Sequence, residues 1–166
     1  MYFHRNNIGS DIAEEYRRII DKIITDIDPI DTSTKSTQNG VQYQLFNQKY
    51  FETLYPIVST VRNQVCSLLS ISNIDLRSAW TVLGKKGTYH TCHRHNTNDD
   101  IATVLYLESP NSNGPEGNFY FFDTQDVHEI KPKKGDLLIF PVTVFHGAYP
   151  QGEGLRQTLN LDFSRY

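Results

Sequence analysis

The chain has 166 residues, which suits one domain and excludes two independent ones. Hydrophobic residues make up 38% and charged residues 21% of the chain, as in a folded globular protein rather than a disordered one. The net charge of -3 argues against a nucleic-acid partner, and no apolar run approaches the roughly 20 residues of a membrane span.

The ends and the cysteines carry little further information. The N-terminal residues lack the apolar stretch of a signal peptide, and Cys66 and Cys92 fit neither a disulfide framework nor a zinc-site spacing. The sequence therefore predicts a cytoplasmic protein without a membrane partner. We expect a single domain over residues 1–166, with a helical support region at 1–75 and a β-rich core at 76–166.

Two helices are predicted before residue 75. Apolar residues at steps of three and four over residues 10–27 indicate an amphipathic helix with Ser10 as its N-cap. A second helix is expected over about residues 56–69, with Pro56 at the first helical position, where proline is tolerated.

Between these helices the sequence is polar and rich in turn-forming residues. Residues 31–40 (DTSTKSTQNG) predict an exposed loop. Residues 41–46 then alternate apolar and polar side chains, which is typical of a strand with one buried face.

After residue 71 the chain consists of short β-like runs separated by glycine, proline, asparagine and aspartate. Eight strands are predicted, at residues 77–83, 88–93, 101–107, 118–122, 127–131, 136–140, 145–149 and 156–163. Eight short strands favour a double-sheet jelly roll. We therefore expect a mainly β fold with the N-terminal helices packed on one outer sheet face.

Three of the six histidines lie within six residues, at His90, His93 and His95. Side chains two apart in a strand point to the same side, so a strand would present His93 and His95 together and turn His90 away. Two imidazoles from one strand edge suit a metal ion. For an isolated His-x-His pair, a solvated strand end is the more common explanation, because most histidines are not metal ligands.

The last predicted strand has a polar face made of Arg156, Thr158, Asn160 and Asp162. If this face lines the barrel interior, the arginine requires an anionic partner, because an unpaired buried charge is costly. Arg156 and the Thr158 hydroxyl would then suit a carboxylate. A final strand with its polar face in solvent fits the pattern as well.

Residues 80–163 resemble the Fe(II)- and 2-oxoglutarate-dependent oxygenases, in particular the prolyl-hydroxylase-like enzymes and a small related group of 2OG-Fe(II) oxygenases. Four blocks match in order: residues 93–95 (HRH), 101–107 (IATVLYL), 132–140 (PKKGDLLIF), and His146 followed ten residues later by 156–158 (RQT). The fold of this family is a double-stranded β-helix, a cupin-like jelly roll of eight strands. That fold agrees with the strand count.

The resemblance implies an iron site. In the family, a His-x-Asp/Glu pair and a distal histidine hold the iron. His93 and His146 match the two histidines, whereas His95 stands where the carboxylate is expected, as it does in the small related group. The implied metal ligands are therefore His93, His95 and His146, and the alternative carboxylate ligands are Asp99, Asp100 and Asp123.

The resemblance also implies a cosubstrate site. Arg156 and Thr158 match the family's Arg-x-Ser/Thr element, which holds the distal carboxylate of 2-oxoglutarate, and Tyr106 matches a tyrosine that contacts the same molecule. The implied cofactors are Fe(II), 2-oxoglutarate and O2, with ascorbate in support. No catalytic residue is expected beyond the metal centre.

The implied activity is hydroxylation of a substrate coupled to decarboxylation of 2-oxoglutarate to succinate. A prolyl or other peptide side chain, or a small molecule such as an amino acid, is the expected substrate. Two other hypotheses stay open. One is a cupin-like three-histidine metal dioxygenase that works without 2-oxoglutarate, and the other is a non-catalytic jelly-roll binding module.

Overall fold

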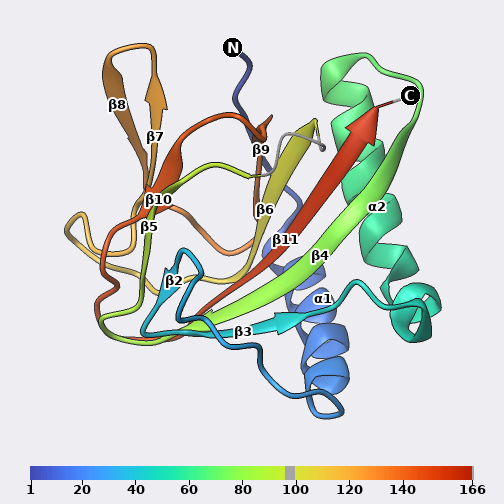
Figure 1. Ribbon diagram of the computed structural model, residues 1–166, viewed down its shortest axis with the longest axis horizontal. Helices are drawn as coiled ribbons and strands as arrows, with labels where there is room; N and C mark the ends of the chain where they lie inside the picture. Colours follow the sequence, from blue (N-terminus) through green and yellow to red (C-terminus); the bar gives the residue numbers. More distant parts are fainter. Residues whose placement is uncertain (96–99, 166) are drawn as a thin grey trace.

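The computed structural model describes residues 1–95 and 100–165. Two antiparallel sheets face each other, and both helices lie on the outer side of the larger sheet (Figure 1). The fold is therefore mainly β with two helices, and its pair of antiparallel sheets confirms the predicted double-stranded β-helix. Within the described residues, neither helix is long and apolar enough to cross a membrane.

The larger sheet has the strand order β1-β9-β6-β11-β4-β3 and the smaller sheet the order β2-β5-β10-β7-β8. The larger sheet contains β1 (His4–Asn7), β3 (Val41–Gln44), β4 (Ile74–Gly84), β6 (Ile101–Glu108), β9 (Asp136–Pro141) and β11 (Arg156–Arg165). The smaller sheet contains β2 (Thr37–Gln38), β5 (Tyr89–His93), β7 (Phe119–Asp123), β8 (Asp126–Ile130) and β10 (His146–Ala148). All eight strands predicted after residue 71 are present, with ends displaced by no more than three residues.

The helices differ from their predicted bounds. Helix α1 (Ser10–Ile24) ends before residue 27, and Gly9 rather than Ser10 occupies the N-cap position. Helix α2 (Phe51–Leu69) begins five residues before Pro56, so the prediction that Pro56 starts the helix is wrong. A 3-10 turn (Gln48–Tyr50), capped by the Asn47 side chain, leads into α2. Pro56 costs one backbone hydrogen bond, which the burial of its apolar neighbours on the sheet offsets.

Residues 1–75 contribute three strands as well as the two helices. Strand β1 pairs with the edge strand β9, although its sequence HRNN has no apolar alternation. Strand β2 lies inside the predicted loop 31–40, where Thr37 is buried against β5. The pairing of β1 with β9 joins residues that are 129 to 135 positions apart in the sequence. The organisation of the chain as a single domain stays a prediction.

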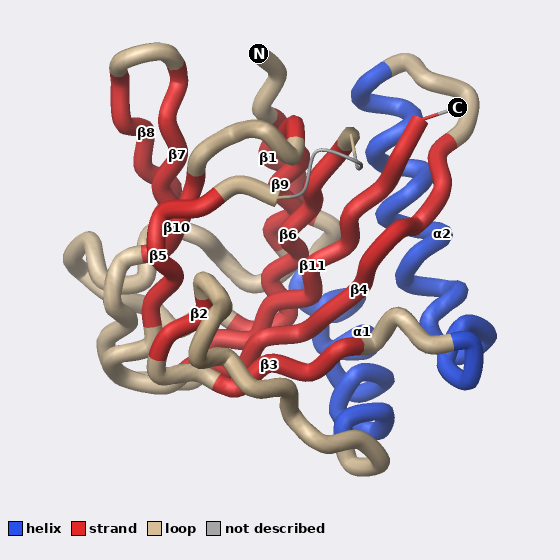
Figure 2. The backbone as a smooth tube through the Cα atoms, viewed as in Figure 1, coloured by secondary structure: helices blue, strands red, loops and turns tan. Residues whose placement is uncertain are grey.

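Two apolar cores decide which way β11 faces. One is made of side chains from the helices and the larger sheet, and the other of side chains from the two sheets. Figure 2 shows the backbone of these layers, with the helices in blue and the strands in red. Leu159, Leu161 and Phe163 belong to the first core, together with Ile20 of α1 and Ile57 of α2. Because side chains alternate along a strand, the polar face of β11 must point between the two sheets.

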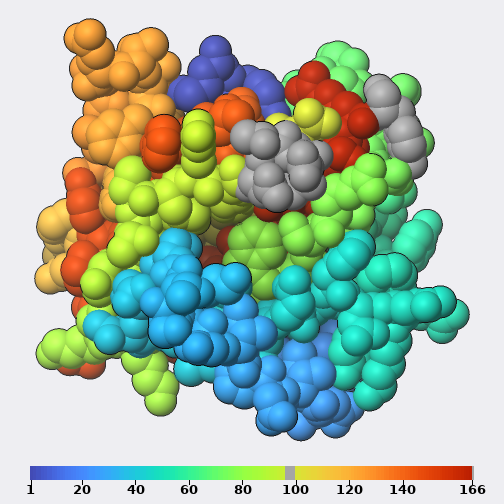
Figure 3. Space-filling view, in the orientation of Figure 1, coloured from blue at the N-terminus to red at the C-terminus, as the bar shows by residue number. Residues whose placement is uncertain are grey.

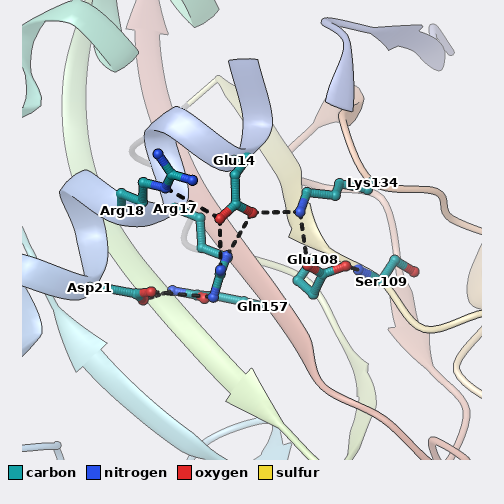
Figure 4. A network of polar contacts seen from close by, with 8 residues as sticks. All are labelled: Glu14, Arg17, Arg18, Asp21, Glu108, Ser109, Lys134 and Gln157. Atoms are coloured by element: carbon teal, nitrogen blue, oxygen red, sulfur yellow. Dashed lines mark hydrogen bonds and ion pairs between the residues drawn. The ribbon is translucent and has the colours of Figure 1, made fainter. Parts of the chain in front are cut away.

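Polar contacts hold α1 on the larger sheet. Lys134, just before β9, donates to Glu14 of α1 at 2.6 Å and to Glu108 of β6 at 2.9 Å. The side-chain amide of Gln157 donates to Asp21 of α1 at 3.0 Å. Figure 4 shows these side chains meeting at one surface of the helix. The contacts tie the helix to the same strands that carry the candidate site on their other face.

We expect Asp136→Ala to lower the free energy of unfolding by about 2–3 kcal/mol, since it removes several hydrogen bonds to one buried charge. The Asp136 carboxylate is 2% exposed and accepts from Arg5, from the Asn7 amide and from the backbone N–H of Lys133. These contacts anchor β1 and the turn before β9. Urea unfolding measures the change, and a variant as stable as the wild type would contradict this account.

Candidate metal centre and adjoining pocket

Three histidine side chains converge between the two sheets. His93 ends β5, His146 begins β10, and the two residues face each other in the antiparallel ladder. His95 lies two residues beyond β5, where its backbone N–H donates to the Val142 carbonyl at 2.9 Å. One potential ligand atom from each histidine lies within 4.8 Å of the others. Within residues 1–95 and 100–165, this is the one group of three or more such side chains.

Hydrogen bonds determine which imidazole nitrogens are available. In each histidine, Nδ1 faces an oxygen atom: Thr91 O at 2.7 Å for His93, Val144 O at 2.9 Å for His146, and Asp162 Oδ2 at 2.8 Å for His95. An Nδ1–H that donates to oxygen leaves Nε2 with a free lone pair. The three Nε2 atoms therefore provide a ligand set that fits a divalent transition metal.

The surroundings favour the neutral form of two of these imidazoles, and the neutral form is the one that binds metal. Burial lowers the pKa of His146 well below its ordinary value, and the neighbouring His93 and His95 add to this effect. Burial also lowers the pKa of His93, against an opposing effect of its bond to the Thr91 carbonyl. Protons therefore compete weakly with a metal ion at His93 and His146.

We expect the metal-free protein to lose stability as the pH falls below about 6.5, the usual pKa of histidine in an unfolded chain. Burial lowers the folded-state pKa of His90, His93 and His146, so the unfolded chain takes up protons before the folded protein does. Each such group contributes a slope of up to about 1.4 kcal/mol per pH unit until the folded-state pKa is reached. Urea unfolding in chelator measures the slope. It should be shallower in His146→Gln, and equal slopes would refute the assignment.

A pocket beside the histidines is lined by the inward face of β11 and by its neighbours. Its polar lining includes Arg156, Thr158 and Asn160 of β11, together with Tyr106, Trp80 and His90. Thr158 and Tyr106 are directly paired across β11 and β6. All four polar residues of the β11 face are buried, so a final strand with this face in solvent is excluded.

The most unusual group in the pocket is the Arg156 guanidinium. It is 3% exposed, and neither of its Nη atoms has a hydrogen-bond partner among the described residues. A buried, unpaired cation is costly and suits an anionic ligand, which a guanidinium can grip with two parallel N–H bonds. Burial raises the pKa of the neighbouring Tyr106 to about 12, so its hydroxyl stays protonated and can donate.

His90 lies in the same pocket, contrary to the prediction that it points away from His93. His93 pairs with His146 and His90 pairs with Ala148, so the four residues 90–93 of β5 lie opposite the three residues 146–148 of β10. This β-bulge reverses the strand parity and turns both histidines inward. Burial and the nearby Arg156 charge lower the pKa of His90 well below its ordinary value. His90 is not part of the three-histidine group.

Gly147 allows β10 to pass between its neighbours. A Cβ atom there would lie 2.8 Å from the His90 carbonyl oxygen and would collide with the Tyr120 phenol ring of β7. A side chain at this position would push β10 away from β5 or β7. The glycine after His146 therefore keeps that histidine beside His93.

The alternative carboxylate ligands lie elsewhere or cannot be placed. Asp100 is exposed and accepts from the Arg165 backbone N–H at 2.6 Å, and Asp123 ends β7. Neither is part of the three-histidine group, and Asp99 lies outside the described residues. The carboxylate that does reach the site is that of Asp162. In the sequence, Asp162 is an even number of residues from Arg156 and Thr158, and this spacing already placed the three side chains on the same face of the strand.

A groove with a volume of about 690 Å³ leads from the surface to the histidines. Its walls are mostly amide, hydroxyl and charged side chains: Asp31, Thr34, Lys35, Ser36, Gln42, Gln44, Ser78, Arg94 and Asp162, with Ile30 and Trp80. The space-filling view shows a hollow between the segment before β3 and the segment that carries β5 (Figure 3). The predicted loop 31–40 thus supplies one wall of the groove.

Comparisons with known proteins agree with this geometry. A family model described as the 2OG-Fe(II) oxygenase superfamily matches residues 79–162. A PKHD-type hydroxylase of Xylella fastidiosa (strain M12) is 39% identical over 57 residues, which is 34% of this chain. The chain thus matches about a quarter, 24%, of the length of that relative.

Solved structures share the fold. A Pseudomonas putida prolyl-4-hydroxylase aligns with a TM-score of 0.73 and 16% identity over 99% of this chain and 92% of its own. A viral collagen prolyl hydroxylase from Paramecium bursaria chlorella virus-1, solved as a 2OG complex, aligns with a TM-score of 0.71 and 20% identity. That alignment covers 98% of this chain and 96% of the viral one.

Proposed function

Because the chain belongs to the 2OG-Fe(II) oxygenase superfamily, whose model matches residues 79–162, we propose that it is a hydroxylase that uses Fe(II), O2 and 2-oxoglutarate. One observation carries the proposal. Three imidazoles whose Nδ1 atoms face oxygen atoms lie beside a buried arginine whose terminal N–H groups have no partner among the described residues. The site thus suits a metal ion and an anion side by side.

His93, His95 and His146 would hold the iron. Imidazole is a ligand that suits iron as well as zinc and copper, so the donor set fits Fe(II) and the choice of metal follows the family. When bound, Fe(II) and 2-oxoglutarate supply the oxidising chemistry: O2 is consumed, one of its atoms enters the substrate as a hydroxyl group and the other enters succinate, and CO2 is released.

The chain's own residues orient the cosubstrate and keep water out. Arg156 would grip the carboxylate that lies away from the metal, and the hydroxyls of Thr158 and Tyr106 would donate to the same group. The ring of Phe119 packs 5.4 Å from that of His146, centroid to centroid, and closes the pocket on the side of β7. This low-dielectric wall strengthens the hold of Arg156 on an anion.

We infer that the substrate is a prolyl or other peptide side chain, or a free amino acid. The polar walls of the groove and its volume of about 690 Å³ support a hydrophilic molecule of this size. Prolyl hydroxylases are among the proteins that share the fold. The net charge of -3 supports the absence of a nucleic-acid substrate. A cytoplasmic location stays a prediction.

The decisive experiment is an anaerobic titration of the purified chain with Fe(II) and then 2-oxoglutarate. A weak visible charge-transfer band would appear only if both bind at one centre, and admission of air should then produce succinate. Assays with and without ascorbate test its supporting role. Stoichiometric iron without a band or succinate would reject the proposal.

The three-histidine ligand set also favours one alternative, a cupin-like dioxygenase that works without 2-oxoglutarate. Such an enzyme has no use for the buried Arg156 guanidinium. It would retain iron in the same titration but give no response to 2-oxoglutarate. A binding module without catalytic function would take up no stoichiometric metal.

A further inference from the structure

We propose that Asp162 is a positioning residue for the metal site, which orients His95 and supplies the negative charge that a third histidine ligand lacks. The inference rests on the proposed function, because it assigns a role toward the same metal. In this chain His95 stands at the position where the family has a carboxylate ligand. Asp162 would thus restore the missing charge from the far side of an imidazole.

The hydrogen bonds of the three histidines are not alike. His93 and His146 each face a neutral backbone carbonyl through Nδ1. His95 instead faces the Asp162 carboxylate at 2.8 Å, with side chains 9% and 4% exposed for the histidine and the aspartate. A carboxylate bound to the outer nitrogen of a ligating histidine fixes the tautomer and makes the inner nitrogen a stronger donor.

His95 needs such support more than the other two histidines. Strand β5 ends at His93, so His95 lies outside the ladder, and its backbone N–H bonds to the Val142 carbonyl. On its ring the structure describes one hydrogen bond, to Asp162, together with the rings of Trp80, His93 and His146, whose centroids lie 5.5, 5.4 and 5.0 Å away. The Asp162 carboxylate therefore sets the direction of its Nε2.

Asp162 is held firmly enough for this task. It lies on β11 between β4 and β6, opposite Ser78 and Ala102. One extra residue on β4, Arg77, interrupts the ladder next to it. Such irregularities re-aim a side chain beside a functional site.

The charge of Asp162 is otherwise unexplained. No lysine or arginine forms an ion pair with it among the described residues, and its Oδ1 has no hydrogen-bond partner there. A buried carboxylate without a cation is costly. A metal ion bound to His95 Nε2 would provide the compensating positive charge through the imidazole.

Asp162→Asn, Asp162→Ala and a matched control, Asp136→Asn, test the proposal. The asparagine can still accept from Nδ1–H without the charge, whereas the alanine loses both contact and charge. Anaerobic titration with Co(II), followed by its visible absorption, should show a loss of affinity of about 10-fold for Asp162→Asn and nearer 100-fold for Asp162→Ala. Asp136→Asn makes the same chemical change at a buried carboxylate away from the site, so its affinity should equal that of the wild type.

The second readout needs no metal. Nitrogen-15 NMR of the metal-free protein should show His95 in the Nδ1–H tautomer in the wild type and a mixture of tautomers in Asp162→Ala, with His93 unchanged. Equal Co(II) affinity and an unchanged His95 tautomer in Asp162→Ala would overturn the proposal. If Asp162→Ala does not fold, unchanged Co(II) affinity in Asp162→Asn would overturn the proposal.

Failure of the proposed function gives a different result. A wild type that binds Co(II) in an Asp162-dependent way, yet makes no succinate with Fe(II), keeps the role of Asp162 and rejects the hydroxylase. A wild type that binds neither metal overturns both. Succinate formation that is unaffected in both Asp162 variants, with unchanged affinity, keeps the hydroxylase and rejects the role of Asp162.

Discussion

We expect His146→Ala to abolish succinate formation and to lower metal affinity by at least about 100-fold, because even residues that only support a ligand cost 10- to 100-fold when they are removed. His146 is 4% exposed, and its Nδ1 bond to the Val144 carbonyl leaves Nε2 facing the other histidines. It is paired with His93 across β5 and β10. Two histidines cannot hold the ion as three do.

The measurement is Co(II) titration together with succinate formation in the presence of Fe(II) and 2-oxoglutarate. His146 also packs against the rings of Phe119 and Phe140, so the alanine leaves a small cavity. His146→Gln fills more of that space and separates loss of the ligand from loss of packing. His128→Ala, which removes an exposed histidine of β8, is the matched control and should behave as the wild type. Metal affinity and turnover retained in both His146 variants would refute the three-histidine site.

Local patterns predicted much of the fold because the two sheets have distinct faces. The alternation along residues 156–163 anticipated both the apolar layer beneath the helices and the inward polar face. It did not decide whether that face is buried, since burial depends on the opposite sheet. Strand β1 was not predicted because its four residues form a strand only through their pairing with β9, which is far away in the sequence.

Some residues of the candidate site could likewise be predicted from the sequence, and others could not. His93 and His146 could be inferred from a resemblance, and Arg156 from its place on a polar strand face. The inward turn of His90 depends on a bulge in β5, which no residue pattern indicates. The contact between His95 and Asp162 depends on the path of the chain after β5 ends. Strand parity applies only inside a regular ladder, and the site lies at its irregular end.

We expect Arg156→Met to raise the KM for 2-oxoglutarate by roughly 10² to 10³-fold and to leave metal affinity unchanged, because truncating one partner of a buried charge pair costs about 2–5 kcal/mol. The guanidinium lies in the pocket beside the histidines, but it is not a metal ligand. Arg156→Lys keeps the charge and loses the two-pronged grip, so its KM should fall between those of the wild type and the methionine variant. Arg77→Met, on the neighbouring strand β4, removes an exposed arginine as a control.

Arg156→Met should not lower the stability of the protein when 2-oxoglutarate is absent. Both Nη atoms of Arg156 are buried and have no hydrogen-bond partner in residues 1–95 and 100–165, so Arg156→Met should be at least as stable as the wild type in urea unfolding without 2-oxoglutarate. Ligand at about 100 times its Kd should then stabilise the wild type by about 2.7 kcal/mol and the variant very little. A gain in stability paired with a loss of 2-oxoglutarate affinity is the expected signature of a residue kept for binding. A variant that is less stable without ligand, and that keeps its 2-oxoglutarate affinity, would assign Arg156 to the fold and favour the cupin-like alternative.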